Sequence, residues 1–141
     1  YGASIRRPAG PGLINFETSY NDSEDDNNQL RFLAGYEWEA RPNFTVGLQY
    51  YLERHDNRDN LHWLTNRLTY RAGRDRHTWS LFTFYSPSDN DWYLRPGYTY
   101  RHSDRWSITA GANLFGGRDA DTFFNQLQDA SNAYVRVRFH Y

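Results

Sequence analysis

The chain has no cysteine, no methionine and no lysine. The lack of cysteine excludes a disulfide framework, a thiol nucleophile and a cysteine-ligated metal. No run of about 18 apolar residues occurs, which excludes a membrane-spanning helix. Charge of one sign is not in excess either, because 16 basic residues stand against 17 acidic ones. Bulk positive charge therefore does not draw this protein to nucleic acid.

Aromatic residues are abundant: five Trp, twelve Tyr and nine Phe make up 18% of the 141 residues, and all 16 basic residues are arginine. This length indicates a single domain. A polar chain with so many aromatic side chains is too hydrophobic in places to be disordered. We therefore expect a fold that distributes aromatic side chains over a surface.

Apolar and polar residues alternate along most of the chain. Apolar side chains occupy every second position from Phe44 to Leu52, from Trp106 to Leu114 and from Ala133 to Tyr141. A period of two with many β-branched and aromatic residues predicts strands. We predict strands over 1–8, 12–21, 29–40, 44–54, 61–72, 77–86, 92–102, 106–116 and 132–141. Most approach the ~9–11 residues with which a tilted strand crosses a bilayer.

The connections between the predicted strands alternate in length. Short turns are expected at 8–11, 41–43, 72–76 and 103–105, and longer polar loops at 21–28, 55–60, 86–91 and 116–131. Gly, Pro, Asn and Asp supply the turn chemistry in both sets. Short turns at one rim and longer loops at the other are typical of transmembrane β-barrels.

Aromatic residues gather beside the expected turns. Those next to the short turns or the chain end are Trp38, Phe44, Tyr70, Trp79, Tyr100, Trp106 and Tyr141. Those near the longer loops are Tyr20, Trp63, Tyr85, Trp92 and Tyr134. Two such rows predict interfacial girdles, because amphipathic rings prefer the water–lipid interface. The alternative is that aromatic residues simply favour strands, as they do in lipocalins.

The chain ends on an aromatic residue, Tyr141, preceded by Phe139, Val137 and Val135 at every second position. This ending resembles the C-terminal signature of bacterial outer-membrane β-barrels. The stretch that begins with 81–89 and continues through 122–124 to the end of the sequence also resembles the C-terminal regions of larger proteobacterial porin-like barrels.

The resemblance implies an all-β fold: an antiparallel up-and-down transmembrane β-barrel of about 8–10 strands. It further implies location in the bacterial outer membrane, contact with membrane lipid and lipopolysaccharide, and recognition of the C-terminal strand by the outer-membrane assembly machinery. The short turns would be periplasmic and the longer loops extracellular. Bacterial single-chain barrels normally have an even number of strands. Because we predict an odd number, we expect residues 1–141 to be the C-terminal wall of a larger barrel, or another chain to complete it.

Alternation assigns the face opposite Tyr141 to the barrel lumen. The charged residues predicted to line it are Arg31, Glu37, Glu39, Glu53, Arg67, Arg71, Arg95, Arg101, Arg136 and Arg138. Arg6, Glu17, Gln49, Thr99, Thr109, Asn113 and His140 are expected on the same face. An excess of arginine favours anions by electrostatic focusing. In a narrow closed barrel the same residues would instead pair with glutamate and fill the interior.

The longest loop contains Phe123, Phe124 and Leu127, whose spacing places them on one face of a helix. This loop either folds into the barrel mouth as a constriction or lies on the rim as a short surface helix.

No catalytic, cofactor or metal site is predicted. The consecutive His102, Ser103 and Asp104 lie in one turn and cannot form a side-chain relay. The acidic run 22–26 lacks the spacing of a calcium-binding loop. His55 and His62 flank a loop with two aspartates, which is at most a weak metal site.

The sequence therefore favours a porin-like protein, not an enzyme, and we expect it to give small hydrophilic, anionic solutes passive passage. One alternative is a non-conducting scaffold barrel that anchors an outer-membrane complex. Another is a soluble calycin-like barrel, with its apolar face inward around a ligand. Nucleic-acid binding by the interleaved arginine and aromatic residues is not favoured, because the arginines occupy the face opposite the apolar one.

Overall fold

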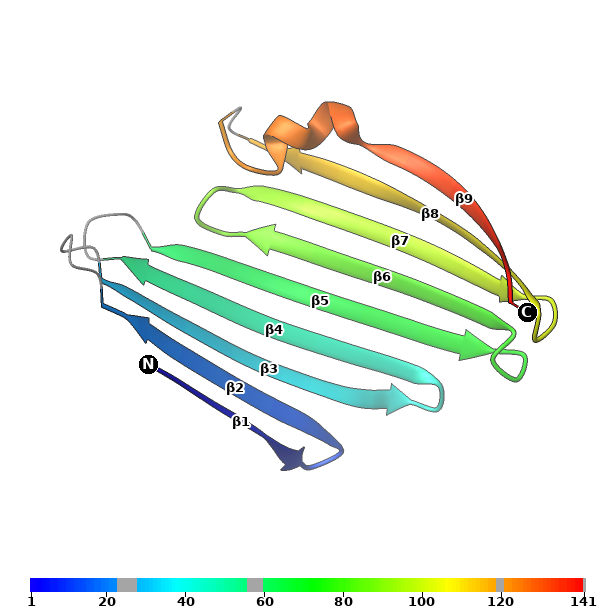
Figure 1. Ribbon diagram of the computed structural model, residues 1–141, viewed down its shortest axis with the longest axis horizontal. Coiled ribbons are helices and arrows are strands. Elements are labelled where there is room, and N and C mark those ends of the chain that lie inside the picture. The colour runs from blue at the N-terminus through cyan, green and yellow to red at the C-terminus, as the bar shows by residue number, and fades with distance from the viewer. Residues whose placement is uncertain (23–27, 56–59, 119–120, 141) are drawn as a thin grey trace.

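The computed structural model describes residues 1–22, 28–55, 60–118 and 121–140, and within these ranges nine strands form one antiparallel sheet in chain order (Figure 1). The strands are β1 (Gly2–Ala9), β2 (Gly12–Asn21), β3 (Gln29–Arg41), β4 (Phe44–His55), β5 (Leu61–Ala72), β6 (His77–Ser86), β7 (Asp91–Arg101), β8 (Trp106–Gly117) and β9 (Asn132–Phe139). A 3-10 helix, η1 (Asn125–Ala130), precedes β9. Every predicted strand is present, with each end within two residues of its predicted position.

Each strand pairs with its neighbours in the chain, because tight turns fold successive strands into hairpins. Two of the turns have two residues, 10–11 and 42–43, in which Gly10 and Asn43 adopt φ values of 57° and 64°. Glycine and asparagine tolerate this left-handed conformation better than other residues. These turns and those at 73–76 and 102–105 lie at one end of the sheet, the short-turn end (Figure 1).

The opposite end, the long-loop end, carries the other connections. One of them is shorter than expected: β6 and β7 are joined by residues 87–90, no longer than the turn 73–76. β7 begins at the buried Asp91, one residue earlier than predicted. The alternation in loop length is therefore weaker than the sequence indicates, and the longest connection is 118–131.

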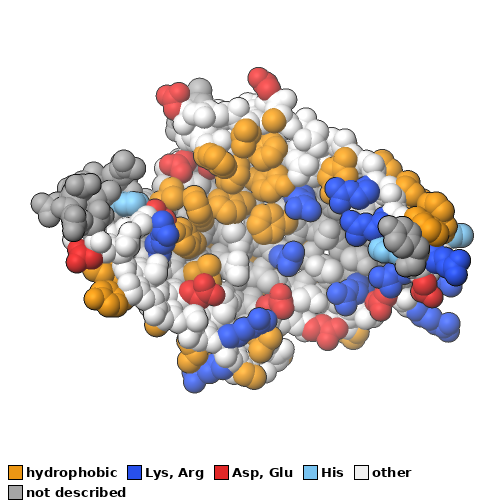
Figure 2. All heavy atoms as spheres, viewed as in Figure 1, with side chains coloured by type: hydrophobic (Ala, Val, Ile, Leu, Met, Phe, Trp, Pro, Cys, Tyr) orange, Lys and Arg blue, Asp and Glu red, His pale blue; other side chains and the backbone are white. Residues whose placement is uncertain are grey.

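The register divides the sheet into two faces, because directly paired residues of neighbouring strands project to the same side. The apolar face carries Ile5, Phe16, Leu48, Leu64, Leu81, Leu94, Ala110 and Val137. The polar face carries most of the charged side chains of the strands and is the face turned toward the viewer in Figure 2.

The sheet is a single layer without a hydrophobic core. Among the described residues no hydrophobic side chain is buried, and Leu48 and Val135 on the apolar face are 45% and 72% exposed. A continuous apolar surface of this kind marks contact with lipid or with another protein. We therefore expect lipid or another protein, and not water, to cover the apolar face.

The sheet is open, so a closed barrel is not observed. β1 and β9 are the two edges, and an even number of antiparallel steps between them makes both strands run in the same direction. Tyr1 and Tyr20 exchange two backbone hydrogen bonds of 2.7 Å. Because this pattern alternates along a strand, Gly2, Ser4, Arg6 and Pro8 direct their backbone groups to the free edge of β1.

Candidate functional site

The polar face is the candidate functional surface. All ten charged residues predicted to line the lumen lie on it: Arg31, Glu37, Glu39, Glu53, Arg67, Arg71, Arg95, Arg101, Arg136 and Arg138. Figure 2 shows basic and acidic side chains spread over the middle of this face, with hydrophobic side chains gathered beneath the β8–β9 connection. The strand register alone brings these residues together, since they come from five strands, β3, β4, β5, β7 and β9.

Most arginines of the polar face have no carboxylate partner. Within the described ranges, only Arg31 has a carboxylate oxygen within 4.0 Å, that of Glu53 at 3.2 Å. Six arginines lack such a partner among the described residues: Arg67, Arg71, Arg95, Arg101, Arg136 and Arg138. The face therefore does not form the Arg–Glu ladder expected of a filled interior, and its positive charge is available to an anion.

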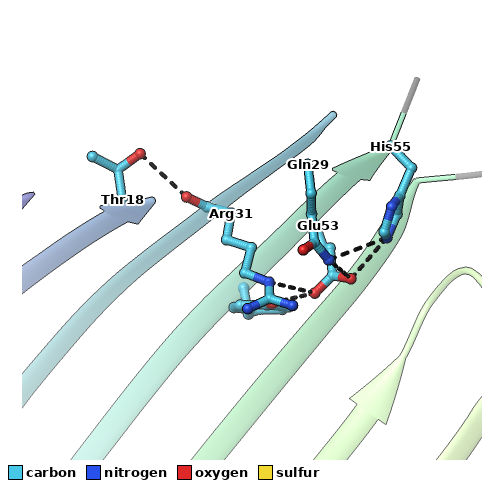
Figure 3. Close-up of polar contacts among 6 residues, drawn as sticks. Thr18, Gln29, Arg31, Glu53 and His55 are labelled. Atoms are coloured by element: carbon cyan, nitrogen blue, oxygen red, sulfur yellow. Dashed lines mark hydrogen bonds and ion pairs between the residues drawn. The ribbon is translucent and has the colours of Figure 1, made fainter. Parts of the chain in front are cut away.

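Glu53 is the centre of a polar cluster at the long-loop end of β3 and β4 (Figure 3). Its Oε2 accepts hydrogen bonds from the Tyr51 hydroxyl and from Arg31 Nε, the latter at 3.2 Å. Its Oε1 accepts a hydrogen bond from Gln29 Nε2 and lies 2.8 Å from His55 Nε2. Because both carboxylate oxygens are occupied, this cluster ties two strands together and leaves little capacity for a ligand.

One hollow of the polar face spans β1 to β6. It has a volume of about 430 Å³ and is lined by Arg6, Glu17, Glu37, Gln49 and Arg67, among others. Gly47 keeps it open, because an added Cβ would meet no atom closer than 3.8 Å. The lining mixes both signs of charge and suits a hydrated polar solute.

A second hollow, of about 490 Å³, lies at the short-turn end between β7, β8 and β9. Arg101, Arg136, Arg138 and His140 line it together with Asp104. The hydroxyls of Thr99 and Thr109 meet at 3.0 Å in its wall. Three guanidinium groups against one carboxylate give this end of the face a positive potential.

The β8–β9 connection folds back over the polar face. Phe124 packs on an aromatic cluster, with ring centroids 5.0 Å from Phe84 and 5.9 Å from Tyr93. Phe123, by contrast, is 69% exposed, and Leu127 is half-buried. The three residues therefore differ in burial, and Phe124 places the segment on the polar face, the side predicted for a constriction.

Asp91 holds this connection in place, and sequence reasoning missed it. Its side chain is buried beside Ser86, and its Oδ2 accepts a hydrogen bond of 2.8 Å from the backbone N–H of Phe124. The only signal in the sequence was an acidic residue at the start of a strand, which is also an ordinary turn residue.

Aromatic side chains form a belt on the apolar face at the short-turn end. Six of the predicted interface residues lie there: Trp38, Phe44, Tyr70, Trp79, Tyr100 and Trp106. Tyr141 lies outside the described residues. Ring centroids are 6.5 Å apart for Phe44 and Tyr70, and 5.6 Å for Tyr70 and Trp79. His77, which was not predicted, joins the belt through its Nδ1, 2.7 Å from the Tyr98 hydroxyl.

The second aromatic row, at the long-loop end, is thinner than expected. Tyr20, Tyr85 and Trp92 lie on the apolar face. Trp63 lies on the polar face, where it stacks on Tyr51 at 5.2 Å. Tyr134 is also on the polar face, opposite Gly111. Trp63 and Tyr134 are predicted for this row because they lie beside a loop. The phase of the apolar–polar alternation, however, determines the face of the sheet from which each side chain projects.

The remaining sequence candidates have structural explanations. Ser103 Oγ accepts hydrogen bonds from the backbone N–H groups of Arg105 and Trp106, at 3.3 and 3.2 Å, so it closes the turn. His55 and His62 project to opposite faces. Residues 23–27 of the acidic run, and the aspartates at 56 and 59, lie outside the described residues.

Two general findings concern the same described ranges. They contain no group of three or more His, Asp or Glu side chains arranged to hold a metal ion. They also contain no helix long and apolar enough to cross a membrane. In comparisons with models of protein families, with curated proteins and with solved structures, none matches this chain.

Proposed function

We propose that this chain is part of an integral outer-membrane protein, and that its sheet forms a wall of a porin-like β-barrel through which small hydrophilic anions diffuse passively. The observation that carries the proposal is the opposition of two faces. One face is continuously apolar and exposed, and the other presents arginines that have no described carboxylate partner. A wall between lipid and an anion-conducting lumen requires this combination.

The strand lengths and the aromatic belt support a bilayer location. A strand of twelve residues such as β4 is about 40 Å long at a rise of about 3.3 Å per residue. Tilted by about 40°, it covers roughly 30 Å, the thickness of a hydrocarbon core. The belt from Phe44 to Trp79 would then lie at the periplasmic interface, where aromatic rings are favoured.

The parity of the sheet supports a wider barrel. Direct closure of β1 on β9 would require a parallel pair, whereas bacterial outer-membrane barrels pair their strands antiparallel. Further strands between the two edges satisfy this rule and enlarge the barrel. A wider barrel leaves an aqueous lumen, whereas one of about eight strands is filled by its own side chains.

A non-conducting scaffold barrel is the second candidate. The observation that favours it is the packing of Phe124 on Phe84 and Tyr93, which places the β8–β9 connection over part of the polar face. A soluble calycin-like barrel is less well supported, because the same connection would then cover the outside of the barrel.

Planar-bilayer recording of the purified protein, refolded in detergent, distinguishes these candidates. A KCl gradient across the bilayer gives the reversal potential in the same experiment. We expect steady conductance steps with a reversal potential of the sign for chloride preference. Silence from a folded and inserted protein, identified by its heat-modifiable mobility on a gel, would favour the scaffold instead. A cation preference would contradict the role assigned to the arginines.

A further inference from the structure

Arg67, Phe82 and Arg95 lie side by side on the polar face, on β5, β6 and β7. Neighbouring strands are about 4.8 Å apart, so the two arginine backbones are separated by roughly 10 Å, with the phenylalanine between them. Neither arginine has a carboxylate within 4.0 Å among the described residues. The register thus places one apolar ring between two uncompensated positive charges.

These three residues border a hollow of about 330 Å³, together with Ser80 and Tyr93. Gly97, opposite Ser80, has no side chain, and the Ser80 hydroxyl takes the space beside it, since an added Cβ would lie 2.8 Å from Ser80 Oγ. Arg67 and Phe82 also line the larger 430 Å³ hollow. The smaller hollow is therefore reached from the open polar face, and its volume suits a ligand with a single ring.

The aromatic wall of this hollow is held in a fixed orientation. The Tyr93 hydroxyl donates a 2.7 Å hydrogen bond to Asn113 Oδ1, and the Tyr93 ring stacks on Phe115 at 4.7 Å. The Phe82 ring meets Tyr93 edge-on at 6.2 Å. Because the rings are set before a ligand arrives, little conformational entropy is lost on binding.

We propose that this hollow binds small aromatic carboxylates. A guanidinium group takes a carboxylate through two parallel hydrogen bonds, and Phe82 and Tyr93 offer the offset or edge-on contacts that a planar ring prefers. A purely hydrophilic anion would use the arginines and make no contact with either ring. The hollow at the short-turn end has three arginines and no Phe, Tyr or Trp, so it provides charge alone. The proposal rests on the proposed function, in which solutes reach the polar face from the lumen.

The test is isothermal titration of the purified protein in detergent micelles with benzoate, cyclohexanecarboxylate and acetate. The three probes share one charge and differ in ring size and planarity. We expect benzoate to bind about three- to tenfold more tightly than cyclohexanecarboxylate, and acetate to bind most weakly. Equal affinity for all three would overturn the proposal.

Variants assign the binding to this hollow. Phe82→Leu should remove the preference for benzoate over cyclohexanecarboxylate, and Arg95→Gln should weaken benzoate about tenfold. Phe32→Leu and Arg54→Gln, both on the apolar face, are the matched controls and should change neither value. Benzoate affinity unchanged in both Phe82→Leu and Arg95→Gln would overturn the site.

Two further controls separate loss of binding from misfolding of a variant and from failure of the proposed transport. Heat-modifiable mobility identifies folded variants, and the three-ligand series on the unmodified protein tests the proposal even if Phe82→Leu does not fold. Binding in micelles needs no transport. Benzoate binding with silent bilayers would therefore refute passage and keep the site, whereas conductance without benzoate binding would refute the site alone.

Discussion

The backbone N–H of Phe124 donates a 2.8 Å hydrogen bond to Oδ2 of Asp91, a carboxylate that is only 1% exposed. This bond joins the longest connection of the chain to the first residue of β7. Phe124 adds its ring to the cluster of Phe84 and Tyr93, so one residue is held by its backbone and by its side chain.

Asp91→Ala should release the β8–β9 connection, because it leaves the Phe124 N–H without its acceptor at a cost of about 1–3 kcal/mol. We expect faster cleavage by added protease between residues 118 and 131, and larger conductance steps. Asp91→Asn, which keeps an acceptor oxygen, should behave like the unmodified protein. Equal cleavage rates in all three proteins would show that the bond does not restrain the connection.

Leu48→Arg should lower the free energy of unfolding in lipid vesicles by about 2–4 kcal/mol, because a charge on the apolar face would lie in the bilayer. The adjacent Gln49 projects to the polar face, so Gln49→Arg should change stability by less than about 0.5 kcal/mol. Urea unfolding followed by tryptophan fluorescence measures both. A similar loss in the two variants would rule out the proposed orientation of the sheet.

Replacing Arg136 and Arg138 together with glutamate exchanges two positive charges for two negative ones in the short-turn hollow. We expect the reversal potential in a KCl gradient to change sign, since the lining then attracts cations. Arg54 lies on the apolar side of β4, so Arg54→Glu is the control and should leave the sign unchanged. An unchanged reversal potential in the double variant would exclude these residues from the ion path.

Gly12→Ala should destabilise the protein by about 1–3 kcal/mol, because its Cβ would lie 2.3 Å from the backbone oxygen of Glu37. Gly47→Ala is the matched control: its Cβ would meet nothing closer than 3.8 Å, and the loss of backbone freedom in the unfolded chain favours alanine. Urea unfolding of both variants checks the register of β2 on β3. Equal stability of the two variants would show that the register at Gly12 is wrong.

Strand positions and faces were accessible to sequence analysis because they depend on local alternation. Phe44 to Leu52 and their polar neighbours specify β4 without information from other strands. The phase of the same alternation also places Arg67 and Arg95 on one face, as the register confirms. Where proximity to a loop replaced phase as the criterion, as for Trp63, the expected face was wrong.

Long-range relationships were not accessible in this way. That Phe124 would meet Asp91 depends on how residues 118–131 return to the sheet, which no local pattern encodes. Closure is a similar case, because β1 and β9 have the same alternation as the inner strands although the sheet ends at both. The aromatic wall beside Arg95 was missed because Phe82 and Tyr93 occupy positions of the polar phase, where we expected polar residues.

Pro8 limits the number of backbone hydrogen bonds that the free edge of β1 can form with an added strand. Its backbone faces outward but has no N–H, so an incoming strand finds donors at Gly2, Ser4 and Arg6 and none at Pro8. Proline is tolerated there because no strand of the sheet lies on that side. A strand added to this edge would thus form its ladder toward the long-loop end and separate from β1 near the short turns. The missing N–H of Pro8 therefore limits how many backbone hydrogen bonds an added strand can form with β1. The pairing between the two strands would be weakest at the short-turn end.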